Sequence, residues 1–420
     1  MRKDTLGIYI HIPFCVRKCA YCDFLSAPPA SAEAMHEYVE ALCREIILKS
    51  RDFATKRNKA TIVDTVFFGG GTPSLLVSED FNRILGTLRE CFTIAEDAEI
   101  TVECNPDTVD YNKFKNYFEQ GVNRISFGLQ SACNEELKML GRIHSYERFL
   151  ESFADARKAG FTNINVDLIS AIPGQTPEGW ALTLKKVAEL GLEHISAYSL
   201  ILEEGTRLFE EQDNYTFPTE DEDAQMYEAT ESILAEYGYK RYEISNYAKE
   251  GFESRHNNRY WQRGEYLGFG VGAASFVDNM RFSNISDVDK YEELLMEAAG
   301  VFYNEQYICC RKAVNIEGVA DVGVFTSKCD VLTDECETLT PNESMAEFFY
   351  LGLRRMEGVF FEDFKQEFKL SPIDIFGEIM DKLVGQNLLE YIKDSCGENI
   401  GIRLTREGIF LSNRVFMEFV

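Results

Sequence analysis

The chain has 420 residues, of which 45% are hydrophobic, so it can bury two or three cores without a disulfide or metal scaffold. Its formal charge of −27 at pH 7 repels phosphate backbones, which argues against nucleic acid as the main partner. No run approaches the roughly eighteen apolar residues of a membrane-spanning helix, so we expect no integral membrane protein.

From residue 7 to about residue 240, short β-branched runs alternate with longer amphipathic stretches. Such repeated strand–helix units predict an α/β fold with a parallel sheet and right-handed crossovers. Six units fit an open, partial (β/α)6 barrel better than a closed eightfold one. The six predicted strands are residues 7–12, 62–68, 99–104, 123–129, 163–169 and 193–200.

Most of these strands have one apolar face and one polar face; in 99–104, for example, Ile100 and Val102 oppose Thr101 and Glu103. An antiparallel sheet with one wet side would show the same alternation. The intervening helices argue against it, because crossover helices cover the apolar face and leave the polar face inside the barrel. Buried polar side chains are costly unless they bind something polar. We therefore expect a polar ligand site that opens at the C-terminal ends of the strands.

The segment HIPFCVRKCAYCDF follows the first predicted strand and contains Cys15, Cys19 and Cys22 in the pattern Cys-x3-Cys-x2-Cys. Three thiolates on one short loop can hold three irons of a [4Fe-4S] cubane and leave the fourth iron open. The alternative is a Cys3His zinc site that includes His11. His11 lies inside a predicted strand, and no second ligand pair is spaced as in a zinc finger, so we favour the cluster.

The segment FFGGGTPS follows the second strand. Three successive glycines more often form a simple tight turn. Here they follow the strand next to the cysteine loop, and glycine lets the backbone approach a ligand closely. We therefore expect Gly70, Gly71 and Thr72 to border the ligand site.

The remainder of the chain divides into an extension of the core up to residue 285, a segment at 286–340 without clear periodicity, and a domain at 341–420. We interpret 1–285 as the core with its extension and 286–340 as a variable linker or insertion. Helical stretches and a hairpin predict a small, mostly helical, winged-helix-like domain at 341–420. The segment LGFGVGAASF lacks the spacing of a dinucleotide fingerprint and is expected to form a turn that closes the barrel.

Several motifs together resemble a known family: Tyr-x-His-x-Pro-Phe before the cysteines, then GGGTP, ECNP, RISFGLQS, GRIHS, NVDLISAIPGQT and GVGAAS. They resemble the radical S-adenosylmethionine (SAM) superfamily, in the branch of oxygen-independent coproporphyrinogen III oxidases. The resemblance covers nearly the whole chain except about 300–340. Within that branch the chain is most similar to the heme chaperones.

The resemblance implies a [4Fe-4S] cluster on Cys15, Cys19 and Cys22. It also implies SAM contacts, in which Asp167 binds a ribose hydroxyl, Glu103 the amino group and Arg142 the carboxylate. The strand alternation had independently assigned Glu103, Gln130 and Asp167 to the ligand-facing side. The full implied set of SAM-binding residues is Tyr9, Tyr21, Gly70, Gly71, Thr72, Glu103, Gln130, Arg142 and Asp167.

Two features distinguish the chaperones from the oxidases. The oxidase motif continues Cys-x-Cys, whereas Cys22 is followed by Asp23 and Phe24. The segment RHNNRYW matches the HNxxYW signature of the chaperones and contains His256. An imidazole is a good axial ligand for heme iron, and adjacent aromatic rings can pack on a porphyrin face. A single histidine is more often a structural residue, but within this signature we favour His256 as a heme ligand.

The predicted function is therefore a heme chaperone that binds the cluster, SAM and heme and passes heme to an acceptor, such as a respiratory heme protein. The alternative is an oxygen-independent coproporphyrinogen III oxidase (dehydrogenase) that uses a 5'-deoxyadenosyl radical. Radical chemistry on another substrate would leave HNNRYW without a role. We expect an electron donor as a further partner.

We also expect a cytoplasmic location, because the twelve cysteines are irregularly spaced and the start MRKDTLG carries no apolar signal segment. This location is compatible with transient membrane association. Four cysteines near the predicted linker fit no familiar second cluster and are interpreted as ordinary thiols: Cys309, Cys310, Cys329 and Cys336.

Overall fold

The computed structural model describes residues 5–57, 61–302 and 332–420. Its first six strands pair in chain order, each parallel to the next, which confirms the predicted parallel sheet and partial barrel. The strands are β1 (Thr5–Ile12), β2 (Ile62–Gly70), β3 (Thr93–Cys104), β4 (Arg124–Gln130), β5 (Ile164–Ser170) and β6 (His194–Ser199).

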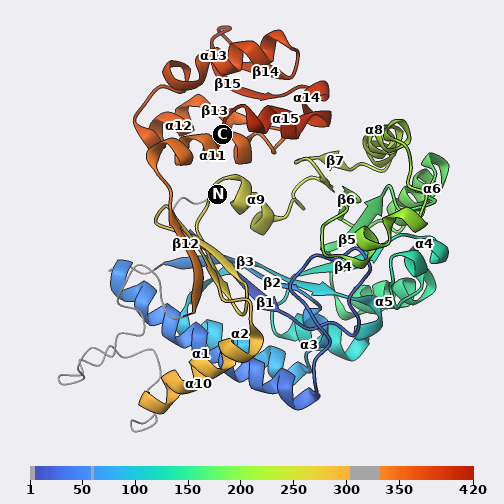
Figure 1. The fold of residues 1–420 in the computed structure, drawn as a ribbon, viewed down its shortest axis with the longest axis vertical. Coiled ribbons are helices and arrows are strands. Elements are labelled where there is room, and N and C mark those ends of the chain that lie inside the picture. Colours follow the sequence, from blue (N-terminus) through green and yellow to red (C-terminus); the bar gives the residue numbers. More distant parts are fainter. Residues whose placement is uncertain (1–4, 58–60, 303–331) are drawn as a thin grey trace.

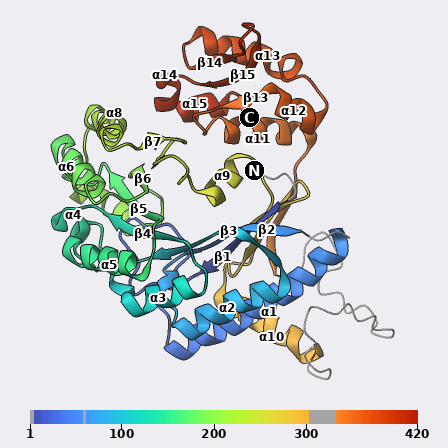
Figure 2. The same ribbon diagram turned by 180° about the vertical axis from the view of Figure 1, so that it is seen from behind.

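Crossover helices lie on the outer side of this sheet (Figure 1, Figure 2). Their starts are fixed by side-chain caps, as where Ser145 accepts from the Arg148 amide and Thr176 accepts from the Gly179 amide. The helices up to β6 are α1 (Ala32–Arg57), α2 (Ser78–Cys91), α3 (Tyr111–Glu119), α4 (Asn134–Met139), α5 (Tyr146–Ala159) and α6 (Pro177–Ala188), with short 3-10 turns η1 (Pro73–Leu75) and η2 (Pro106–Thr108).

The apolar face of each strand lies under these helices, as the alternation predicted. Ile8, Ile10 and Ile12 of β1 are fully buried and share one core with Val39 and Leu42 of α1. Burial of such side chains is the main stabilising contribution of a crossover helix, at about 1.5–3 kcal/mol for each large side chain. The opposite face of the same strands is left for polar groups inside the barrel.

The sheet continues beyond both ends of the six-stranded core. After β6 come α7 (Arg207–Glu210), η3 (Gln212–Asn214), α8 (Glu220–Glu236), β7 (Lys240–Arg241) and β8 (Asn246–Ala248), and β8 pairs antiparallel with β6. At the other edge, β9 (Tyr266–Phe269) pairs parallel with β1, and β10 (Ala274–Val277), β11 (Met280–Asn284) and β12 (Thr333–Thr338) follow it. The resulting sheet has 12 strands.

The glycine-rich segment predicted as a barrel-closing turn contains a turn, but also most of strand β9 before it and the start of β10 after it. Gly268 lies in β9, where a Cβ would come 2.2 Å from the carbonyl oxygen of Ala274. Only glycine therefore lets β10 fold back so closely on β9. Gly270, with φ +98°, and Gly272, with φ +66°, form the turn.

Between these elements lie α9 (Arg255–Trp261) and α10 (Val288–Phe302). The helix α10 and the strand β12 lie within the segment interpreted as a variable linker or insertion, and α10 packs along α1 (Figure 1). Its Tyr291, Leu294 and Leu295 have helical spacing, which the sequence interpretation overlooked. Three of the cysteines interpreted as ordinary thiols, at positions 309, 310 and 329, lie outside the described residues.

The C-terminal part has its own hydrophobic core around Phe349, Phe364 and Met380. It contains helices and a three-stranded sheet in the order β13-β15-β14, which includes the predicted hairpin. The elements are α11 (Pro341–Gly352), β13 (Val359–Phe360), α12 (Phe361–Phe368), α13 (Pro372–Gly385), β14 (Leu389–Lys393), β15 (Asn399–Leu404), α14 (Arg406–Phe410) and α15 (Ser412–Met417). Among the described residues no helix is long and apolar enough to cross a membrane.

Candidate functional site

The three cysteines lie on the loop between β1 and α1, at the C-terminal end of the first strand. Cys15, Cys19 and Cys22 are free thiols and partly exposed. Two backbone hydrogen bonds hold the loop: the Cys15 amide donates to the carbonyl of Ala27 at 3.0 Å, and the Ala20 amide, between Cys19 and Cys22, donates to the carbonyl of Leu140 at 2.9 Å. These main-chain contacts position the segment that carries the three thiols.

Two polar side chains contact the sulfur atoms. The Thr72 hydroxyl lies 3.4 Å from the Cys15 sulfur, and Arg142 donates from Nη1 to the Cys19 sulfur at 3.4 Å. The other arm of Arg142 donates to the Gly128 carbonyl at 2.5 Å, which fixes the guanidinium beside the loop. A positive charge at this distance stabilises thiolates, the form that binds iron. Burial raises the pKa of Cys22.

The arrangement fits a cubane cluster better than a zinc ion. Both ring nitrogens of His11 are engaged: Nδ1 lies 3.0 Å from the Tyr9 hydroxyl and Nε2 lies 2.9 Å from the Leu25 carbonyl. In the described part of the chain, no three Cys, His, Asp or Glu side chains converge on a point where one metal ion could bind. Three thiols spread over one loop match the donor set of a cluster that leaves its fourth iron open.

The glycine-rich turn lies directly beside this loop. Gly70 has φ +105°, and a Cβ there would come 2.5 Å from the His11 ring. Its amide donates to Glu103 Oε2 at 3.2 Å, and the next amide, of Gly71, donates to the Ile12 carbonyl at 2.8 Å. Burial and the charge of Asp167 raise the pKa of Glu103 to about 8, although the Gly70 amide lowers it. The buried cation Arg124 also lowers this pKa, but burial and the neighbouring carboxylate outweigh it.

Asp167 lies two strands away from Glu103, in β5, with β4 between them. It accepts from Asn165 Nδ2 at 2.8 Å and from the Ser126 hydroxyl at 3.2 Å. Burial raises its pKa, whereas hydrogen bonds from Ser196, Asn165 and Ser126 lower it. The donors therefore fix the orientation of the carboxylate.

The remaining predicted SAM residues lie between these groups. Gln130 has the left-handed φ of +74°, and its amide nitrogen and Arg142 both border Gly128. Tyr21 packs against the small cluster of Leu140, Ile169 and Ile172. Burial raises the pKa of Tyr21. The positive charge of Arg142 lowers this pKa, whereas the charges of Cys19, Cys22 and Asp167 raise it further. The structure therefore brings the predicted cluster ligands and the predicted SAM residues into one neighbourhood.

His256 lies elsewhere, on α9, and is only 1% exposed. Its Nδ1 is 2.9 Å from the Thr65 hydroxyl, its Nε2 is 2.7 Å from the Tyr260 hydroxyl, and its ring stacks on Phe67 at 5.2 Å between centroids. Burial, aided by the charges of Arg259 and Arg124, lowers its pKa to about 3. The imidazole is therefore neutral and fully hydrogen-bonded.

The neighbours of His256 were missed by the sequence interpretation. Thr65 and Phe67 share a face of the run IVDTVFF, so the same alternation used for other strands would have assigned them to the barrel interior. Glu99 caps α9 by accepting from the Arg255 amide at 3.0 Å and the His256 amide at 2.9 Å. Arg259 forms a buried ion pair with Asp64 of β2. The HNNRYW helix is thus anchored inside the barrel.

A chain of hydrogen bonds joins Asp167 to this helix. Asn165 donates to Asp167, and the side-chain oxygen of Asn165 lies 2.5 Å from His194 Nδ1. His194 Nε2 in turn lies 2.8 Å from the Tyr242 hydroxyl. The Tyr242 hydroxyl accepts from the amide of Ser254, the N-cap of α9, at 3.3 Å. The alternation had assigned Asn165 to the polar face, but nothing in the sequence indicated His194 or Tyr242.

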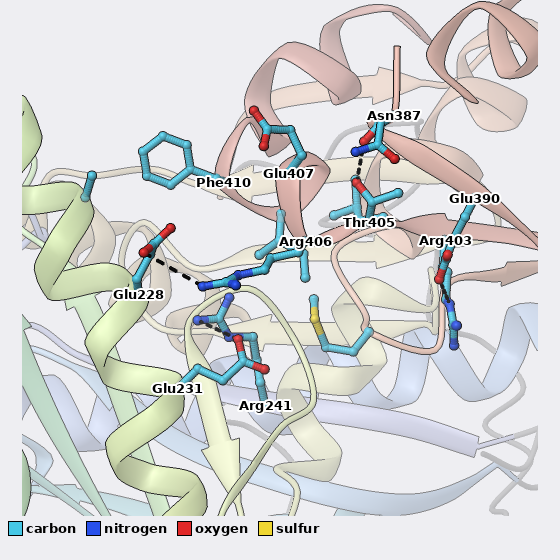
Figure 3. A pocket seen from close by; sticks show the side chains of 14 residues that line it. Glu228, Glu231, Arg241, Asn387, Glu390, Arg403, Thr405, Arg406, Glu407 and Phe410 are labelled. Atoms are coloured by element: carbon cyan, nitrogen blue, oxygen red, sulfur yellow. Dashed lines mark hydrogen bonds and ion pairs between the residues drawn. The ribbon is translucent and has the colours of Figure 1, made fainter. Parts of the chain in front are cut away.

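A separate groove of about 870 Å³ lies between α8 and the C-terminal domain (Figure 3). Six of its charged side chains pair with one another: Glu228 with Arg406, Glu231 with Arg241 and Glu390 with Arg403. None of the predicted site residues lines it.

Comparisons with known proteins agree with this geometry. The model of the radical SAM superfamily matches residues 9–187, and that of the HemN C-terminal domain matches residues 339–411. A protein named heme chaperone HemW from Lactococcus lactis is 34% identical over 100% of this chain and 98% of its own length. The protein of the same name from Bacillus subtilis is 32% identical over 98% of each chain.

Among solved structures, the Escherichia coli coproporphyrinogen III oxidase HemN, described as a radical SAM enzyme, superposes with a TM-score of 0.79. It covers 99% of this chain and 90% of its own, at 23% identity, and so shares the fold. The chain belongs to the radical SAM superfamily, in the coproporphyrinogen III oxidase-like branch that includes the proteins named heme chaperone HemW.

Proposed function

We propose that this protein is a heme chaperone that binds a [4Fe-4S] cluster, SAM and heme, and transfers heme to an acceptor protein. The observation that carries the proposal is the pairing of the three-thiol loop and its polar neighbours with the HNNRYW helix in one barrel. The relatives that match along the whole chain carry the name heme chaperone HemW, which supports the same function. An electron donor and a heme acceptor, in the cytoplasm, are the partners that this function requires.

In this proposal Cys15, Cys19 and Cys22 hold the cluster, and its open iron would bind the amino and carboxylate groups of SAM. Arg142 would orient the carboxylate of SAM, since its guanidinium is fixed beside Cys19. The remaining polar side chains take the contacts that the family implies. Glu103 faces the amino group, Asp167 a ribose hydroxyl, and Tyr9, Tyr21, Gly70, Gly71, Thr72 and Gln130 enclose the ligand.

Heme is the cargo, and His256 is its proposed axial ligand. A neutral imidazole is the form that binds iron, and the low pKa of His256 keeps it neutral at physiological pH. Its burial means that heme reaches Nε2 only after the hydrogen bond to Tyr260 has opened.

The test is an anaerobic heme titration of protein reconstituted with iron and sulfide, followed by absorption spectroscopy with and without SAM. His256→Ala is expected to weaken binding at least tenfold and to change the heme spectrum. His36→Ala is the control, because His36 lies on α1 and pairs with Asp80 at 2.7 Å, far from α9 in the fold. Absence of heme binding by the wild-type protein, or identical spectra for His256→Ala and wild type, overturns the proposal.

Coproporphyrinogen III oxidase activity is the alternative, because the cluster and SAM residues would serve both functions. The same reconstituted protein, supplied with reductant and coproporphyrinogen under strict anaerobic conditions, distinguishes the two. A chaperone yields no protoporphyrinogen and little 5'-deoxyadenosine. Accumulation of both products would support the enzyme instead.

A further inference from the structure

The two ring nitrogens of His256 have different surroundings. Each ring nitrogen faces one hydroxyl: Thr65 from strand β2 on Nδ1, and Tyr260 from the same helix on Nε2. Phe67 covers one ring face, and Tyr260 meets the ring edge-on at 5.1 Å between centroids. The ring is therefore held in one orientation, with a tyrosine hydroxyl at the nitrogen that would bind iron.

A neutral imidazole donates from one nitrogen and accepts at the other, so only one of the two hydroxyls can donate to it. A phenol is far more acidic than an aliphatic alcohol and is the stronger donor, whereas the alcohol oxygen is the better acceptor. Within the described residues the Tyr260 hydroxyl has no other hydrogen-bond partner. This favours a donor hydroxyl on Tyr260, with Nδ1–H donating to Thr65.

We propose that Tyr260 is a latch on His256: its hydroxyl occupies Nε2 in the heme-free protein, and its departure frees the Nε2 lone pair to bind iron. The inference rests on the proposed heme function and names the positioning residues of that site. His256 does not have to lose a proton when iron binds. The hydrogen bond from the Tyr260 hydroxyl to Nε2 breaks, and the iron–Nε2 bond forms. The proton stays on Nδ1, which continues to donate to the Thr65 hydroxyl. Thr65 thereby fixes the tautomer.

The ring of Tyr260 also packs against residues near the C-terminal domain. The Tyr260 ring belongs to a small apolar cluster with Tyr266 of β9, Phe276 of β10 and Leu339, just before α11. The next residue, Trp261, lies under the guanidinium of Arg354 at 4.3 Å. The latch is thus in contact with the segment that leads into the C-terminal domain.

The first test is heme affinity of Tyr260→Phe in the reconstituted full chain. Removing a hydrogen bond that competes with iron is expected to tighten binding about 2- to 10-fold. Tyr239→Phe is the matched control, since it removes a buried tyrosine hydrogen bond, 2.6 Å to the Leu192 carbonyl, outside the heme and SAM residues, and it is expected to leave heme affinity unchanged. Unchanged or weaker binding by Tyr260→Phe overturns the latch, as does an equal gain in the control.

The second test needs no heme. Selective ¹⁵N-histidine labelling of the heme-free protein reports the tautomer of His256, identified by its absence in His256→Ala. We expect Nδ1–H in the wild type and in Tyr260→Phe, and a mixture of tautomers with weaker heme binding in Thr65→Val. Nε2–H in the wild type overturns the latch even where heme binding depends on His256. Heme binding that ignores His256 overturns the proposed function instead.

Discussion

Glu103 is the residue whose charge state the structure constrains most clearly. In the folded cofactor-free protein its pKa is raised from the ordinary value of 4.5 to about 8. Between these two pH values the folded protein therefore keeps a proton on Glu103 that the unfolded chain has lost. The stability that the protonated carboxyl provides is complete below about pH 4.5 and is lost as pH rises through about 8. The free energy of unfolding should fall by up to about 1.4 kcal/mol per pH unit in that window.

Chemical denaturation of cofactor-free protein between pH 5 and pH 8.5 measures this slope. Glu103→Gln retains the size of the side chain without the titration, and should show a flatter profile. Parallel profiles for the variant and the wild type would contradict the assignment. With SAM bound, the amino group that Glu103 is proposed to face should favour the ionised carboxylate and reverse the trend.

Two glycines show how local geometry decides the effect of one methyl group. Gly70 has φ +105° and faces the His11 ring, so Gly70→Ala should destabilise the protein by about 1–3 kcal/mol and impair cluster reconstitution. Gly86 lies within α2, where a Cβ would meet nothing within 4 Å, so Gly86→Ala should stabilise by about 0.5–1 kcal/mol. Thermal unfolding measures the change in stability of both variants. A change of the same sign in the two variants would contradict this prediction.

At the scale of elements, α1 is tied to the extension of the sheet by one buried carboxylate. Glu45 pairs with Lys49 at 2.7 Å and accepts from the Gly270 amide at 2.7 Å and the Tyr291 hydroxyl at 2.6 Å. It also accepts from Asn284 of β11 at 2.7 Å. Three elements, α1, β11 and α10, and the turn after β9 thus meet at a side chain that is fully buried.

Glu45→Ala should therefore cost about 3–5 kcal/mol, because it leaves Lys49 buried without its main counter-ion. The control is another carboxylate four residues from a lysine, in α3: Glu119 faces Lys115 at 3.8 Å, and both are exposed. Glu119→Ala should change the free energy of unfolding by less than about 0.5 kcal/mol. Urea unfolding compares the two variants, and similar losses would show that burial is not the cause.

The strands and the cysteine loop could be predicted because their signals are local. Alternation placed β1 to β6 within two residues at each end, except that β3 begins six residues earlier than predicted, at Thr93. The spacing of Cys15, Cys19 and Cys22 was sufficient to suggest a cluster. The strand β9 could not be predicted, since its four residues become a strand only by pairing with β1, far away in the sequence. The burial of His256 was hidden for the same reason, because Thr65 and Glu99 reach it from other strands.

At the scale of the whole molecule, Glu347 of α11 joins the C-terminal domain to the barrel. It accepts from Arg263 at 3.1 Å and from Arg281 at 2.8 Å, and its side chain is 4% exposed. Hydrogen bonds and the charges of these arginines hold its pKa below the ordinary value despite burial. The contribution of this carboxylate to stability is present above its ordinary pKa and is lost in acid.

Glu347→Ala should loosen the C-terminal domain and cost about 3–5 kcal/mol, because two arginines lose their common partner. Hydrogen exchange of α11 and of the β10–β11 hairpin should rise in this variant. In the groove of Figure 3, Glu228 and Arg406 also join the two parts, but at 3.8 Å and with both side chains exposed. Glu228→Ala should leave exchange unchanged, and a comparable rise there would contradict the assignment.

The position of β9 beside β1 has a consequence for how the chain is made. The first strand leaves the ribosome early, yet its second neighbour in the sheet is synthesised only with residues Tyr266–Phe269. Until then the nascent barrel presents an open backbone edge next to its cysteine loop, the kind of edge that recruits other extended chains. If the cysteine loop binds its metal cluster on the ribosome, the cluster is inserted before β9 covers this edge. If the cluster is inserted after release, the sheet is already complete.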